Sequence, residues 1–412
     1  MTVKRRNVKR RALALTVAMA VGLGGPLALW AQDMGGISLT YGVDSRIAGH
    51  DNLDLDTTDE RSSVVWDTRL SFGFRTTTQV SWLGLDAGAL LRQKLGGDAT
   101  VENGLINPNI GLTFGRAGVN ARIEGGLSLS ETDLANNETL DEFDTPAGSR
   151  RDRSANLQLT WGLDSRVSWR LGATVRNSEF DDSPGSLDRR TLTYTAGATL
   201  ALSEAMSLDL GLSRNDFRED GEDSEITNAL NAGLTIARMN GTFSFGLSAS
   251  DTPSGDRTGL TVGRSLELPD GTLSAQIGAT RLISGDMALT GALDYSRDMP
   301  RGRLTASLSR DVSSSSEDDS EVEVTRASVG LSQDLTDRAR ISADLGLAQQ
   351  SYTDDSQPDI RNIRAGVSFS YELGQDWLAT AGLSHVQRRR DGGDATDNSV
   401  YIGVRRSWER SY

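Results

Sequence analysis

Beyond residue 36, apolar residues recur at every second position along much of the chain, and small polar or charged residues occupy the positions between them. From Ile363 to Tyr371 every odd position is apolar, and the same holds from Trp377 to Leu383, after a break at 373–376. Alternation with a period of two predicts β-strands that have one apolar and one polar face. Further runs of this kind are Trp66–Phe74, Val119–Leu129, Leu192–Leu200, Met206–Leu212 and Ala339–Leu347.

The connections between these strands alternate in length. Short ones are predicted near 76–79, 115–118, 163–165, 203–205, 238–241, 268–271, 299–302, 335–337 and 373–376. Longer, mostly acidic ones are predicted between them, near 50–61, 131–150, 177–188, 215–224, 313–323, 351–359 and 388–398, with weaker breaks near 251–256 and 283–286. Together they divide residues 36–412 into about 18–20 strands of one domain.

Three features favour a membrane-spanning barrel over a soluble β-sandwich. The strands have roughly 10 to 13 residues, against a mode of five or six in soluble proteins. One face is well filled with apolar residues, and connection length alternates along nearly the whole chain. Because lipid offers no hydrogen bonds, strands that cross it must close on themselves, with short turns at one end and long loops at the other. The predicted fold is all-β, a single antiparallel up-and-down transmembrane β-barrel of about 18–20 strands.

Aromatic residues gather beside the predicted short turns. A membrane barrel carries such residues as a girdle at the level of the lipid headgroups, whereas in a soluble protein they would simply pack at strand ends. Their concentration at one end of the strands favours the girdle. The candidate girdle residues are Phe74, Phe114, Trp161, Trp169, Tyr371 and Trp377.

The first 31 residues have a different composition. Six basic residues within 4–11 precede an apolar stretch that contains Gly and Pro and ends in Leu29-Trp30-Ala31. This layout predicts a cleaved secretory signal peptide at 1–31 and a barrel domain at 32–412, rather than a transmembrane anchor. The segment holds six of the 43 basic residues, so the rest of the chain has 37 basic against 57 acidic residues and a formal charge of −20. A surface this acidic argues against nucleic acid as a partner.

The chain ends in VYIGVRRSWERSY, with Tyr412 last and Trp408 and Val404 in phase with it. Arg406 and Arg410 share that phase, where an apolar residue is more usual. Together with the signal segment, the absence of cysteine and the alternating strands, this ending resembles the Gram-negative outer-membrane β-barrel proteins, and above all the β-barrel porins. The resemblance implies a place in the cell outer membrane and contact with outer-membrane lipid and lipopolysaccharide. It also implies that Tyr412 is an assembly signal for the outer-membrane assembly machinery.

If the apolar face meets lipid, the alternate positions line the lumen. A barrel of this size is too wide for its own side chains to fill. Charged rows across the lumen would then bias which solutes pass, or would merely be paired and solvated residues of the wall. The candidate pore-lining residues are Asp67, Arg69, Asp86, Arg122, Glu124, Arg166, Arg170, Arg176, Asp209, Arg340, Asp344 and Arg364. The expected function is a porin-like channel for the passive diffusion of small hydrophilic solutes.

Other functions find less support in the sequence. The chain has two histidines, His50 and His385, and no cysteine, and no motif around them suggests a catalytic site, a metal site or a cofactor. The acidic loops match no calcium-binding repeat. Two alternatives remain open at this level, a non-conducting structural or adhesive outer-membrane barrel with acidic surface loops, and a secreted soluble β-rich adhesin.

Overall fold

The computed structural model describes residues 36–57, 60–99, 101, 103–134, 148–183, 186–314, 321–353, 359–374, 376–390 and 393–412. The predicted signal peptide and most of the 131–150 loop lie outside these ranges, so both stay predictions. All regular structure within them is β-strand, and no helix there is long and apolar enough to cross a membrane. The strands are β1 Gly36–His50, β2 Ser63–Thr77, β3 Ser81–Gly97, β4 Gly104–Ala117, β5 Ala121–Asp133, β6 Ser149–Trp161, β7 Val167–Asp181, β8 Arg189–Ser203, β9 Met206–Glu219, β10 Glu225–Arg238, β11 Gly241–Thr252, β12 Gly255–Leu268, β13 Gly271–Arg281, β14 Met287–Met299, β15 Gly302–Ser314, β16 Glu321–Asp334, β17 Ala339–Tyr352, β18 Ile360–Gly374, β19 Trp377–Arg390 and β20 Gly393–Ser411.

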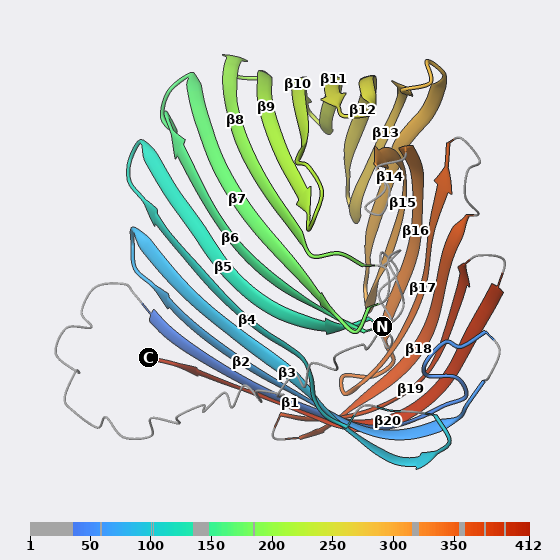
Figure 1. Cartoon of the computed structure of the whole chain (residues 1–412). Helices are drawn as coiled ribbons and strands as arrows, with labels where there is room; N and C mark the ends of the chain where they lie inside the picture. Colours follow the sequence, from blue (N-terminus) through green and yellow to red (C-terminus); the bar gives the residue numbers. More distant parts are fainter. Residues whose placement is uncertain are drawn as a thin grey trace, which may run out of the picture.

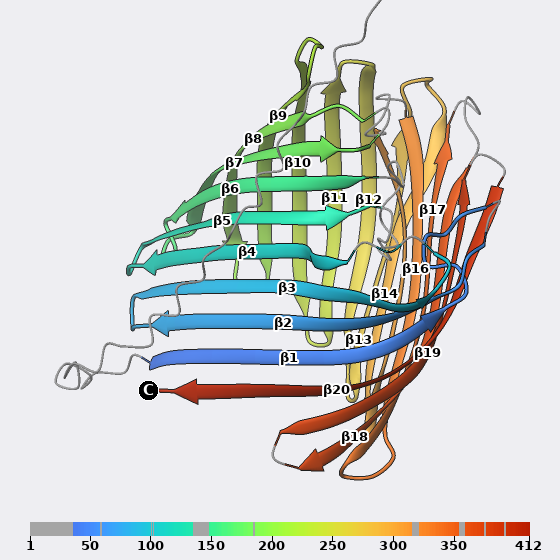
Figure 2. The same cartoon turned by 60° about the horizontal axis from the view of Figure 1, so that its bottom comes forward.

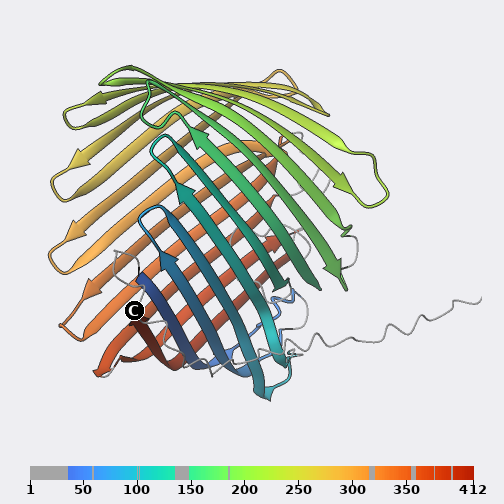
Figure 3. The same cartoon turned by 90° about the vertical axis from the view of Figure 1, so that its left-hand side faces the viewer.

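The twenty strands form one closed antiparallel ring. Each strand pairs with its neighbours in sequence, and β1 pairs with both β2 and β20, which closes the barrel (Figures 1 and 2). The strands run obliquely to the barrel axis, as Figure 3 shows. Closure gives the edge groups of β1 and β20 a partner, so no strand edge is left for lipid to satisfy. The predicted fold class and strand number are confirmed.

The connections alternate as predicted, with two corrections. A connection that the alternation pattern does not reveal joins β3 to β4, at 98–103. The predicted long loop at 388–398 is wrong, because β19 runs to Arg390 and β20 starts at Gly393, with Arg388 paired to Ala395. The polar residues that suggested a loop there instead continue both strands beyond the apolar band.

The strand register separates two faces. On the outer face large apolar side chains are exposed although they belong to regular strands, for example Leu247 at 60%, Ile277 at 70% and Ile402 at 67%. The inner face carries the alternate positions, mostly Ser, Thr, Gly and charged residues. A soluble protein would bury the apolar face, so its exposure around a closed ring marks the surface that meets lipid.

Compact apolar packing is confined to the end of the barrel that carries the long loops. Ala48 of β1 and Val65 of β2 are buried together with loop residues Leu53, Ala99 and Val101. Register places Ala48 and Val65 on the inner face. The β1–β2 and β3–β4 loops therefore fold onto the inner wall rather than away from it.

The register of the last strand is continuous despite its two unusual arginines. β20 pairs along its length with β19 and β1, and the backbone of Tyr412 exchanges two hydrogen bonds with Ile37. The Arg406 guanidinium lies 5.2 Å from the ring centre of Trp377 and 4.7 Å from that of Trp408. An arginine stacked between two tryptophans at the short-turn end can extend its charge toward the lipid headgroups. Arg406 can therefore lie on the outer face of β20.

The β1–β2 loop is tied to β20 by a set of hydrogen bonds around Asp51. Its carboxylate accepts the backbone N–H of Asn398 over 2.6 Å and the side-chain amide of Asn398 over 2.7 Å. The next residue, Asn52, donates its backbone N–H to Asp397. Partial burial raises the pKa of Asp51, but these hydrogen bonds outweigh it and hold the pKa below its usual value. Burial instead raises the pKa of Asp54 in the same loop.

Acid is expected to release this attachment. The pKa of Asp51 is lower in the folded protein than in the unfolded chain, where it has the usual aspartate value of about 4. The ionised carboxylate therefore stabilises the fold fully above about pH 4, and this stabilisation is lost as the pH falls through the folded pKa. In an NMR titration the side-chain amide of Asn398 should therefore shift with a midpoint below about 4, while Asp54 titrates above that value. The variant Asp51→Asn should abolish the Asn398 transition; a midpoint at or above the usual value would contradict the assignment.

Candidate functional site on the inner face of the barrel

Eleven of the twelve predicted pore-lining residues share the inner register of the strands. The exception is Arg166, which lies in the turn between β6 and β7 and belongs to neither strand. The other eleven come from β2, β3, β5, β7, β9, β17 and β18, so they are spread around the ring rather than gathered at one point. Whether they line a conducting path stays a prediction.

The most buried of these residues is Asp67, which is 1% exposed. Arg92 of β3, directly opposite in register, donates from Nε to Asp67 Oδ1 over 2.8 Å and from Nη2 to Oδ2 over 3.0 Å. Arg46 of β1 approaches the same carboxylate at 3.5 Å and also lies over the ring of Tyr401. This two-pronged pairing fixes the relative positions of β1, β2 and β3 on the lumen side.

A second group lies near the short-turn end. The ring of Trp82 on β3 extends over Gly115 of β4, where an added Cβ would come within 1.9 Å of it. Arg122 of β5 stacks on that ring at 4.8 Å and donates to Glu124 over 2.5 Å. Gly115 therefore leaves the space that lets an inner tryptophan reach across one strand to an arginine on the next.

Charge is unevenly distributed around the inner wall. Asp152 of β6 binds Arg150, Arg176 and Ser178. These residues form a third charged group on β6 and β7. By contrast, the inner positions of β11 and β13 hold only Thr, Ser, Gly and Gln. The strands β1 to β7 therefore form a charged sector of the inner wall, and further inner charges lie on β17 and β18. β11 and β13 carry none, whereas β12 between them carries Arg257 opposite Ser250.

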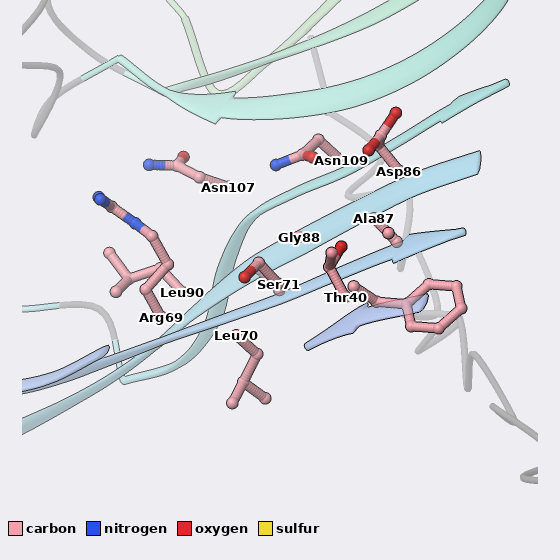
Figure 4. A pocket seen from close by; sticks show the side chains of 13 residues that line it. Thr40, Arg69, Leu70, Ser71, Asp86, Ala87, Gly88, Leu90, Asn107 and Asn109 are labelled. Carbon is pink, nitrogen blue, oxygen red and sulfur yellow. The ribbon is translucent and has the colours of Figure 1, made fainter. Parts of the chain in front are cut away.

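A niche opens in the charged sector, on β1 to β4. Its volume is about 450 Å³, and its polar lining is formed by Thr40, Arg69, Ser71, Asp86, Asn107 and Asn109. Figure 4 shows these side chains on one side of the sheet, while Leu70 points to the other side. The register between β3 and β4 shifts at Gly88/Leu90, beside Asn109, and Asn107 has a positive φ of 49°. Asn109 faces the niche opposite Gly88, and Asn107 lies beside the register shift.

All six predicted girdle residues lie on the outer register beside short turns. Trp161 and Trp169 stack with ring centres 6.3 Å apart, across the β6–β7 turn. Trp377 begins β19 and lies under Arg406. Their positions fit a headgroup level, and their role there stays a prediction.

Several inner-face residues do not appear among the predicted ones, notably Arg46, Trp82, Arg92, Arg150 and Asp152. Arg92 and Trp82 occupy the same alternating phase as Asp86 on β3, so that phase alone would have found them. Arg46 lies on β1, which holds no predicted residue. Asp152 comes directly after the predicted 131–150 loop, so the sequence pattern does not place it within a strand. What no pattern reveals is which of these charges pair with one another.

The two histidines each contact one polar side chain of β20. His50 Nδ1 lies 2.8 Å from Asp397, and both residues are buried, at 6% exposed. His385 Nδ1 contacts the side chain of Asn398 on the outer register. No group of three or more metal-ligating side chains occurs in the ranges that the structure describes.

Comparison with known proteins gives similarity in structure only. No family model matches the sequence, and no curated protein does. A mutant of the ferric enterobactin receptor PfeA from Pseudomonas aeruginosa is 11% identical, with a TM-score of 0.53 over 90% of this chain and 80% of that one. The siderophore receptor PirA from Acinetobacter baumannii is 10% identical, with a TM-score of 0.52 over 91% and 81%. PirA from Pseudomonas aeruginosa is 12% identical, with a TM-score of 0.50 over 91% and 80%.

Identities this low show a shared fold and assign no substrate. The fold agrees with what the chain itself displays, a closed ring of long antiparallel strands with an exposed apolar outer face. Such a ring satisfies every requirement for crossing a bilayer with β-strands. The chain therefore has the fold of these receptors, a closed 20-stranded antiparallel β-barrel with an apolar outer face.

Proposed function

We propose that the protein is a porin-like channel through which small hydrophilic solutes diffuse passively across the outer membrane. The observation that carries this proposal is the inner face of a closed 20-stranded ring, which is mostly polar along the described strands. Polar side chains on the inner face do not contact lipid, and we expect water in the lumen to solvate them. A ring of twenty strands is wider than those whose side chains fill the interior.

The charges on the inner wall support a channel that distinguishes between solutes. Opposite charges on a pore wall create a field across the lumen and orient polar solutes that pass through it. Loop residues Leu53, Ala99 and Val101 pack against the inner wall at the long-loop end. We expect lipopolysaccharide and outer-membrane lipid around the apolar face, and the outer-membrane assembly machinery to recognise the strand that ends at Tyr412.

Planar-bilayer recordings on refolded protein provide the test. Insertion of single barrels should raise the conductance in discrete steps, because each barrel adds one water-filled path. A heat-denatured sample at the same concentration serves as the control. A membrane that stays sealed at all voltages, although the protein has inserted, would reject the channel and favour a closed structural or adhesive barrel.

A further inference from the structure

We propose that the niche on β1 to β4 is a binding site for a short peptide in extended form, with free amino and carboxyl ends and about three residues. This inference rests on the proposed channel function for its biological meaning, but not for its test. The niche joins several features that do not occur together elsewhere on the described inner wall: a cavity, a shifted strand register, a positive φ at Asn107 and two unpaired opposite charges.

The two charges are Arg69 of β2 and Asp86 of β3. Among the described residues, neither the Arg69 guanidinium nor the Asp86 carboxylate has a hydrogen-bond or ion-pair partner. Asp44 is the register neighbour of Arg69 on β1, yet the two form no ion pair. Asp67, on the same strand as Arg69, is by contrast paired with Arg92. Arg69 therefore presents five donors to the cavity, and Asp86 presents two acceptors.

The spacing of the charges selects the length of the ligand. Asp86 lies opposite Gly73 in register, and Gly73 is four residues along β2 from Arg69. Four residues of a strand span about 13 Å between Cα atoms. An extended tripeptide spans about 10 Å, and the long arginine side chain can cover the difference. A single amino acid, whose charged groups are separated by one carbon atom, cannot reach both Arg69 and Asp86.

Side-chain amides occupy the interval between the charges. Figure 4 shows Asn107 and Asn109 between Arg69 and Asp86. The side-chain oxygen of Asn107 accepts the backbone N–H of Asp133 over 2.7 Å, which leaves its NH₂ group to donate. Asn109 has no partner among the described residues and offers both a donor and an acceptor. A side-chain amide matches the hydrogen-bonding groups of a peptide bond, so this interval suits a peptide backbone.

Two glycines keep the floor of the niche open. A Cβ at Gly73 would come within 2.3 Å of the Thr40 hydroxyl and 3.4 Å of Asp86, and one at Gly88 within 3.1 Å of Asn109. The hydroxyls of Thr40 and Ser71 line the same floor. The cavity volume of about 450 Å³ lies within the range of small-ligand sites. A peptide with small side chains would sit with its carboxylate on Arg69 and its ammonium on Asp86.

The test uses trialanine with free ends as the probe. Equilibrium binding to the intact barrel in detergent is measured alongside transient blocks of single-channel current. Arg69→Gln and Asp86→Asn should each weaken trialanine binding by about tenfold or more, since each removes a charge-assisted contact. N-acetyl-trialanine should lose the dependence on Asp86, and trialanine amide the dependence on Arg69. The matched controls Arg170→Gln and Asp294→Asn change the same charges elsewhere on the inner register and should leave binding unchanged.

The outcomes separate the niche from the channel. Conductance without trialanine binding, or binding that Arg69→Gln and Asp86→Asn do not alter, would overturn the proposed peptide site. The proposed channel function would not be affected. Trialanine binding to a barrel that does not conduct would support the proposed peptide site and reject the proposed channel function. Equal affinity for free alanine would overturn the assigned length of the ligand.

Discussion

Replacing Asp67 by alanine should lower the free energy of unfolding of the barrel by about 3–5 kcal/mol, because the change removes the carboxylate that binds a buried arginine. The Asp67 carboxylate is almost completely buried, and Arg92, itself 6% exposed, binds it through two nitrogens. Arg46 loses the same partner, but its side chain is 30% exposed and can turn toward water. Urea unfolding of the protein refolded into lipid vesicles measures the loss.

Two further variants separate charge from packing. Asp86→Ala removes an inner-face carboxylate that is exposed and unpaired, and should change stability by no more than about 0.5 kcal/mol. The double variant Asp67→Val with Arg92→Met should recover much of the stability lost in Asp67→Ala, since apolar residues of similar size often replace a buried ion pair without cost. Equal losses in Asp67→Ala and Asp86→Ala would show that the pairing contributes nothing.

An arginine on the lipid side of the barrel should cost about 2–4 kcal/mol if it lies near the middle of the bilayer. Leu247, in the middle of β11, is 60% exposed on the outer face, and the next residue, Ser248, belongs to the inner register. We therefore expect Leu247→Arg to refold poorly into vesicles and to unfold at lower urea. Ser248→Arg should keep the stability of the unaltered protein, since its charge reaches the water of the lumen.

This neighbouring pair also tests the orientation of the whole barrel. Both substitutions introduce arginine at neighbouring positions of the same strand, so only the face of the barrel differs. Similar losses in both variants, or a greater loss in Ser248→Arg, would contradict the assignment of the apolar face to lipid. In bilayer recordings Ser248→Arg should alter ion selectivity, because it places a charge on the inner face of β11, which has none.

Alternation and turn length were sufficient to predict the ring, because each strand of a membrane barrel must repeat one constraint, apolar outside and polar inside. The register of a strand follows from this constraint, since a shift of one residue would turn every side chain to the wrong face. The inference is weakest where the constraint ends. Beyond the bilayer, β19 and β20 continue with polar residues on both faces, and the sequence there reads as a loop although Arg388 and Ala395 are paired.

The sequence by itself determined the fold class, the approximate strand number and the face on which eleven candidate residues lie, since these depend on periodicity that is local to each strand. Only the tertiary structure decided which charges meet. Asp67 and Arg92 are 25 residues apart, and Asp51 and Asn398 are 347 apart. Closure of the ring and the shifted register of β3 and β4 bring such residues together or, at Arg69 and Asp86, leave them unpaired around a cavity. Those contacts depend on side-chain packing between distant segments, which no local pattern encodes.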